Sequence, residues 1–128
     1  MFLGLRTIIY PAPDLDASKA WFTNLLGIAP YFDEPFFVGF QVAGYELALD
    51  PSGDPNIGPI TLWGVADADA ALAELLGAGA LPHGDVRDVG DSIRVATVIE
   101  PGGTVLGVIE NPHFQLPAPP PHFDGPGR

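Results

Sequence analysis

The sequence has no cysteine and few basic residues. Only five of its 128 residues are lysine or arginine, against 16 aspartates and glutamates, and the net charge is −11 at pH 7. A nucleic-acid backbone demands a cationic face, so this composition argues against a nucleic-acid partner. The absence of cysteine excludes disulfides, thiolate metal sites and a cysteine nucleophile. The acidity either favours cationic small molecules or only keeps the protein soluble.

Long apolar runs are also missing. No run approaches the roughly 18 residues that a membrane span needs. No basic segment followed by an apolar run indicates a secretory signal. We therefore expect a cytoplasmic protein with no membrane partner. Apolar residues make up 47% of the chain, which is enough to build the core of one domain of this length.

The first half of the chain begins with a strand and a helix. The apolar run LRTIIY (5–10) predicts a strand, and the prolines that follow end it. Asp14 or Asp16 then caps a helix that stops at Gly27, and Phe22, Leu25 and Leu26 are expected to face inward. Three more strand-like segments follow: 28–32, 36–42 and 45–50. A tight hairpin at Ala43-Gly44 joins the last two.

The same order returns in the second half. GPITLWGV (58–65) predicts a strand, Asp67 or Asp69 caps a second helix, and the run GAGA (77–80) ends it. The segments LPHGDVRDV, SIRVATVIE and TVLGVIE complete the pattern. PDLDAS aligns with ADADAA, and GYELAL aligns with GTVLGV. Each half therefore reads β-α-β-β-β, and two such units can enclose one core or cavity.

These paired halves resemble the vicinal oxygen chelate superfamily, which includes glyoxalase I, extradiol dioxygenases and bleomycin-resistance proteins. The stretches that carry the resemblance are YPAPDLDASKAWFTNLLG, WGVADADAAL and VATVIEPGGTVLGVIENP. The resemblance implies an α+β fold in which two βαβββ modules, about 3–51 and 57–111, form a curved, barrel-like mixed sheet with the helices outside. We expect one domain over residues 1–113 and a proline-rich tail over 114–128. Homodimerisation is common in the resembled superfamily, so a homodimer is also expected.

In metal-dependent members of this superfamily, the ligands come from the centres of the first and fourth strands of each module. The internal repeat maps those positions onto Thr7, Ala48, Ile60 and Gly107. Divalent metals at such sites need imidazole or carboxylate donors, and none of these residues provides one. The resemblance therefore points to the metal-free branch, without a cofactor. The histidines His83, His113 and His122 fall in a loop or near the tail, away from the expected cavity.

Strand alternation predicts which side chains line that cavity. The predicted lining is Thr7, Ile9, Phe37, Gly39, Glu46, Ala48, Ile60, Leu62, Arg94 and Gly107. This lining is mostly apolar, with Glu46 and Arg94 as polar handles or, alternatively, as a salt bridge at the rim. Glycines within the strands, such as Gly39 and Gly107, indicate either space for a ligand or a close contact inside the fold.

Three functional hypotheses follow. The first is a metal-independent small-molecule binding protein, for example one that sequesters a toxic or antibiotic-like compound. The second is a glyoxalase-like lyase or isomerase, or a dioxygenase-family enzyme, acting on a small organic substrate, with Glu46 as the one candidate acid–base residue. The third is a structural domain without a ligand. The missing metal donors favour binding over catalysis.

Overall fold

The computed structural model describes residues 1–115, which form one eight-stranded sheet and two helices. The elements are β1 (Gly4–Pro11), α1 (Leu15–Leu26), β2 (Phe32–Glu34), β3 (Phe37–Val42), β4 (Tyr45–Asp50), β5 (Ile60–Gly64), α2 (Ala68–Gly77), β6 (Leu81–Gly90), β7 (Ile93–Ile99) and β8 (Val105–Glu110). Each half is β-α-β-β-β, as the repeat predicts. The proline-rich stretch 116–128 and His122 lie outside the described residues.

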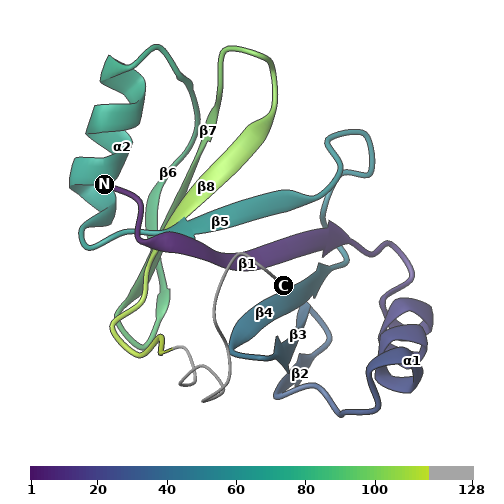
Figure 1. Ribbon diagram of the computed structural model, residues 1–128. Helices are drawn as coiled ribbons and strands as arrows, with labels where there is room; N and C mark the ends of the chain where they lie inside the picture. The colour runs from purple at the N-terminus through teal and green to yellow at the C-terminus, as the bar shows by residue number, and fades with distance from the viewer. Residues whose placement is uncertain (116–128) are drawn as a thin grey trace, which may run out of the picture.

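The sheet is mixed and has β1 and β5 at its centre. Its strand order is β2-β3-β4-β1-β5-β8-β7-β6. β1 runs antiparallel to β5, and each of the two runs parallel to the last strand of its own half. Figure 1 shows the halves curving away from this central pair, with α1 beside one half and α2 beside the other. The predicted α+β class is confirmed, with a sheet that is curved and unclosed.

Aspartate caps start both helices. The side chain of Asp14 accepts a hydrogen bond from the backbone N–H of Ala17, and Asp67 accepts the equivalent bond from Ala70, each at 3.1 Å. These bonds satisfy amide groups that a helix start leaves without partners. Gly27 ends α1 in the left-handed conformation, with φ 69°. Asp14 and Asp67 are therefore the N-terminal caps of α1 and α2.

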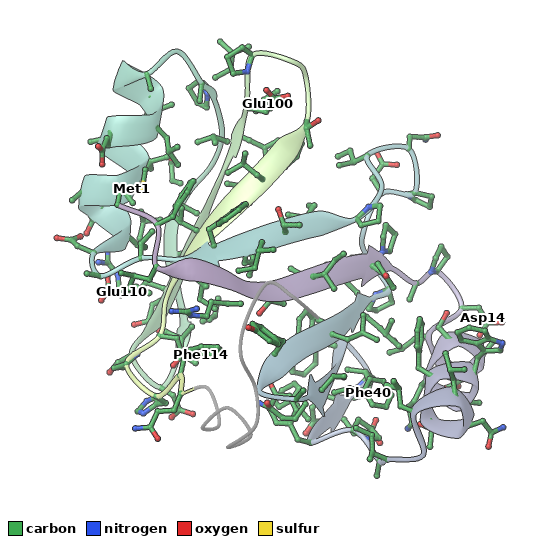
Figure 2. All side chains as sticks on the ribbon, viewed as in Figure 1. Met1, Asp14, Phe40, Glu100, Glu110 and Phe114 are labelled. Atoms are coloured by element: carbon green, nitrogen blue, oxygen red, sulfur yellow. The ribbon has the colours of Figure 1, made fainter. Side chains whose placement is uncertain are left out.

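Each helix covers its own half of the same sheet face. Val38, Phe40 and Leu49 are fully or almost fully buried, and Phe22 and Leu26 of α1 pack against them. Phe40 lies between the sheet and α1 in Figure 2. In the second half of the chain, α2 contributes to a separate core cluster. This cluster contains Val65, Ala68, Ala71, Ala96 and Val108. Within residues 1–115 the opposite face of the sheet carries no helix, and we call it the helix-free face.

Two local predictions were wrong. The strand expected at 28–32 lies further along the chain, as β2, because Pro30 has no N–H and pairing with β3 starts with the bond from Tyr31 N to Gly39 O. Leu25, expected to face inward, is 63% exposed, since Phe22 and Leu26 occupy the buried side of α1.

Helix length bears on membrane contact. α1 has 12 residues and α2 has 10. Over residues 1–115, no helix is long and apolar enough to cross a membrane.

Candidate functional site

A row of residues crosses the helix-free face in a single register. Each residue of the row is paired with the next one on the neighbouring strand, in the order Gln41, Glu46, Thr7, Leu62, Gly107 and Thr97. We call this the Thr7 row. It contains two of the positions that the resemblance assigns to metal ligands, Thr7 and Gly107. The other two, Ala48 and Ile60, pair with Ile9 in the adjacent row.

Glu46 is the acidic residue of this row, and two hydroxyl groups fix its carboxylate. Thr7 Oγ1 donates to Glu46 Oε1 at 2.9 Å, and the Tyr31 hydroxyl donates to Oε2. Thr7 is only 6% exposed. A Cβ atom on Gly39 would lie 2.8 Å from Glu46 Oε2 and 2.9 Å from Tyr31 Cε1. Gly39 therefore makes room for this hydroxyl–carboxylate cluster, and protein side chains fill the space.

The cluster changes the acidity of Tyr31. Partial burial of the phenol raises its pKa, and so do the hydrogen bond to Glu46 and the negative charge of that carboxylate. The pKa lies well above the ordinary tyrosine value near 10. Tyr31 is thus a neutral hydrogen-bond donor at physiological pH, and its phenolate is not available as a base.

A bulge brings Arg6 onto the same face as Thr7. The pairing of β1 with β5 shifts between Leu5 and Thr7, which breaks strict alternation. The Arg6 guanidinium then lies over Gly64, where an added Cβ would be only 2.6 Å from Nε. Its Cζ also lies 3.9 Å from the ring centre of Phe114, a cation–π contact. Figure 2 shows Phe114 beside β1.

Together these groups enclose a small cavity of about 50 Å³. Its lining consists of Arg6, Thr7, Tyr31, Gln41, Gly44, Glu46, Ile109, Asn111 and Phe114. It thus combines one cation, one carboxylate, two hydroxyls, two amides and an aromatic ring. Sequence reasoning found Thr7 and Glu46 but missed Arg6, Tyr31 and Phe114. No sequence signal marks the bulge, and Tyr31 and Phe114 lie outside regular strands.

A larger hollow of about 440 Å³ lies beside α1. Its walls are Tyr10, Pro11, Pro13, Ser18, Phe22, Leu49, Pro55, Gly58 and Pro59. The wall residues include no carboxylate, basic group or histidine. This hollow therefore offers a surface for apolar contact but little chemistry.

Arg94 does not lie where strand alternation predicts. Its Nη1 contacts Asp69 Oδ2 of α2 at 2.7 Å and Glu110 Oε1 at 3.9 Å. The hydrogen bond to Asp69, together with the nearby carboxylates, raises the pKa of Arg94 above its ordinary value. The prediction failed because β7 pairs Thr97, and not Ala96, with Gly107. Arg94 therefore faces α2, as its contact shows, and the cation that lines the cavity with Glu46 is Arg6.

The remaining predicted lining residues are not part of the cavity wall. Strand alternation places them on the same sheet face as Thr7: Ile9, Phe37, Gly39, Ala48, Ile60, Leu62 and Gly107. The space beside Gly107 is filled by Leu62 and Thr97. His83 lies in strand β6 and not in the predicted loop. Its Nδ1 is 2.8 Å from Thr97 Oγ1, at the end of the Thr7 row away from the cavity.

These residues do not fit a divalent metal ion. Thr7, Ala48, Ile60 and Gly107 supply one hydroxyl between them, and Leu62 Cδ2 would lie 2.5 Å from a Cβ placed on Gly107. Glu46 already accepts hydrogen bonds from two hydroxyls. Across residues 1–115, no three histidine or acidic side chains gather closely enough to hold a metal.

No protein-family model and no curated protein matches this chain. Solved structures do match. Streptomyces coelicolor methylmalonyl-CoA epimerase in complex with 2-nitronate-propionyl-CoA is 17% identical, with a TM-score of 0.72 over 91% of this chain and 100% of that one. A glyoxalase/bleomycin resistance protein/dioxygenase superfamily member from Vibrio splendidus 12B01 is 18% identical, with a TM-score of 0.64 over 84% and 99%.

A Mn(II)-bound glyoxalase from Novosphingobium aromaticivorans is 16% identical, with a TM-score of 0.62 over 84% of this chain and 38% of that one. Likeness at these identities concerns the fold. The protein has the vicinal oxygen chelate fold, and the resemblance read from the sequence is confirmed at that level.

Proposed function

We propose that this protein binds a small organic molecule on its helix-free face without a metal ion, as a binding protein of the glyoxalase/bleomycin-resistance type. The observation that carries the proposal is the position of Glu46, which Thr7 and Tyr31 hold in the Thr7 row. A carboxylate already oriented by two hydroxyls loses little freedom when it accepts a hydrogen bond from a ligand. Sequestering a toxic or antibiotic-like compound needs such affinity and no chemistry.

The cavity size limits what is enclosed. About 50 Å³ is far below the several hundred Å³ of sites that enclose a whole drug-sized ligand. The cavity therefore takes the polar end of the ligand, and the remainder lies against partly exposed apolar residues of the helix-free face such as Ile9 and Ile60. A second copy of the chain would cover this remainder, and the exposed aromatic side chains of Phe32 and Phe36 offer it apolar surface.

The second candidate function is metal-independent proton transfer. Glu46 supports it, because a carboxylate in the cavity can take a proton from a carbon atom next to a carbonyl group. Tyr31 would then stay a neutral donor that orients Glu46. Under this alternative, Glu46→Gln abolishes turnover and keeps substrate binding within severalfold. Turnover that survives the substitution contradicts it.

The test of the binding proposal is thermal stability against a panel of divalent metals and small organic compounds, with EDTA as a further condition. We expect metals and EDTA to leave the midpoint unchanged. A bound compound raises the midpoint as RT ln(1 + [L]/Kd) grows. The rise should be lost in Glu46→Gln and kept in Glu74→Gln, a matched change on α2. Stabilisation by a metal well below millimolar concentration, or destabilisation by EDTA, overturns the proposal.

A further inference from the structure

The cavity contains two opposite charges that do not pair with each other. The ion pairs within residues 1–115 join Lys19 to Asp33, and Arg94 to Asp69 and Glu110. Arg6 and Glu46 both line the cavity, yet no ion pair between them falls within 4.0 Å. The cavity therefore presents one positive and one negative group at separate points of its wall.

The protein itself holds each of these charged groups in place. The Arg6 guanidinium lies between Gly64 and the Phe114 ring, and its Nη1 donates only to the neighbouring carbonyl of Leu5, at 3.3 Å. Most of its five N–H donors are left without a partner among the described residues. Glu46 has a hydroxyl on each oxygen, and each carboxylate oxygen can accept one more hydrogen bond.

The charges restrict the ligands that fit. A simple anion would meet Arg6 but would also face Glu46 and a net charge of −11. A simple cation would meet Glu46 but would face Arg6. A group that carries both signs, close together, satisfies both residues at once. The side-chain amides of Gln41 and Asn111 supply further donors and acceptors to the same cavity.

The volume restricts the size of this group. One water occupies roughly 10–15 Å³ on the same measure, so a cavity of about 50 Å³ holds roughly three to five non-hydrogen atoms. A carboxylate, its α-carbon and an amino group together have about five. We propose that the cavity binds the zwitterionic head group of an α-amino acid, with the ammonium at Glu46 and the carboxylate at Arg6. This inference rests on the proposed binding function and names its ligand class.

The experiment titrates the protein with L-phenylalanine and L-alanine, and with the N-acetyl and amide derivatives of each, followed by NMR chemical shifts. N-acetylation removes the positive charge, and amidation removes the negative one. We expect both parent amino acids to bind and each derivative to bind about tenfold more weakly or worse, because one charge of the cavity wall then lacks its partner.

Variants assign each preference to one residue. Glu46→Gln should abolish the preference for the free ammonium and keep the preference for the free carboxylate. Arg6→Gln should do the reverse, and Arg6→Lys, which keeps the charge, should retain part of the carboxylate preference. Glu74→Gln and Arg94→Gln are the matched controls away from the cavity, and both preferences should remain in them.

The outcomes separate the two proposals. Parent amino acids that bind no better than their derivatives, or that do not bind up to their solubility limit, overturn the zwitterion inference. If another organic compound still binds in a Glu46-dependent way, the proposed binding function survives that result. Stabilisation by a metal ion, with no organic ligand bound, overturns both.

Discussion

The guanidinium of Arg6 lies over the ring of Phe114, with 3.9 Å between Cζ and the ring centre. Arg6 comes from the first strand of the sheet, and Phe114 follows the last one. The contact thus closes one side of the cavity with residues from both ends of the described chain. The cavity wall is complete only when both halves of the sheet have formed.

Thr7→Val tests the bond that orients Glu46. Valine keeps the shape of threonine but removes the hydroxyl that donates to Glu46 Oε1. We expect the free energy of unfolding, measured with urea, to fall by about 1 kcal/mol, and ligand affinity to fall with it. Thr23→Val on α1, away from the Thr7 row, is the comparison. An equal loss in both variants would mean that valine itself, and not the lost bond, causes the effect.

The raised pKa of Tyr31 predicts a stability change at alkaline pH. The folded protein holds the phenol proton more tightly than the unfolded chain does. This contribution is therefore complete below about pH 10, the unfolded value, and is lost as the pH rises toward the folded value. Stability should fall in this range, and Tyr31→Phe should reduce the fall. Urea unfolding at several pH values measures it.

Tyr45→Phe is the comparison for that experiment, because Tyr45 does not bond to Glu46 in the described structure. Phenolate absorbance provides a second readout. The raised pKa of Tyr31 should give a late ionisation phase, and this phase should vanish in Tyr31→Phe. A late phase that persists in Tyr31→Phe contradicts the assignment.

Gly39→Ala tests the space that the hydroxyl–carboxylate cluster occupies. The new methyl group would lie 2.8 Å from Glu46 Oε2 and 2.9 Å from the Tyr31 ring, so both side chains must move. We expect a loss of about 1–3 kcal/mol in stability and a larger loss of ligand binding. Gly77→Ala is the control, since a Cβ there meets nothing within 4 Å. It should keep or slightly raise stability. Unchanged ligand binding in Gly39→Ala would show that the hydroxyl–carboxylate cluster is not part of the binding site.

Asp14→Ala tests whether the aspartates before the helices are caps. It removes the oxygen that accepts from Ala17 N, and thermal unfolding should show a loss of about 1 kcal/mol. Asp16→Ala changes only a charge in the first turn, so a loss of a few tenths is expected. Ligand binding should be unchanged in both. Lost binding with intact stability would give Asp14 a role that capping does not explain.

The fold was predictable because its signals are local and repeated. Asp14 and Gly27 mark the ends of α1, and Asp67 marks the start of α2 at the matching place in the second half. Ala43 and Gly44 both have positive φ values, 53° and 90°, as the predicted tight hairpin requires. These features depend on residues that are close together in the sequence, so they can be predicted from the sequence alone.

The site was less predictable because it depends on how distant strands pair. The pairing of Thr97 with Gly107 decides which face of the sheet each side chain of β7 occupies. No local sequence pattern shows this pairing, so the prediction put Arg94 on the wrong face. The bulge before Thr7 likewise depends on the register between β1 and β5. Arg6 therefore had no sequence signal. Thr7 and Glu46 do line the cavity, since the alternation of side chains holds from Thr7 onward in β1 and throughout β4.

Four glycines of the sheet each leave room for a side chain from a neighbouring strand: Gly39 for Glu46, Gly64 for Arg6, Gly84 for Thr97 and Gly107 for Leu62. The two members of each pair are therefore coupled, and their substitutions are not additive. A larger residue at Gly39, for example, becomes tolerable only after Glu46 is replaced by a shorter residue and the Tyr31 ring moves aside. During divergence, a substitution at one of these glycines should be accompanied by a substitution at the residue beside it. Homologues that replace one of these glycines should then also differ at its partner.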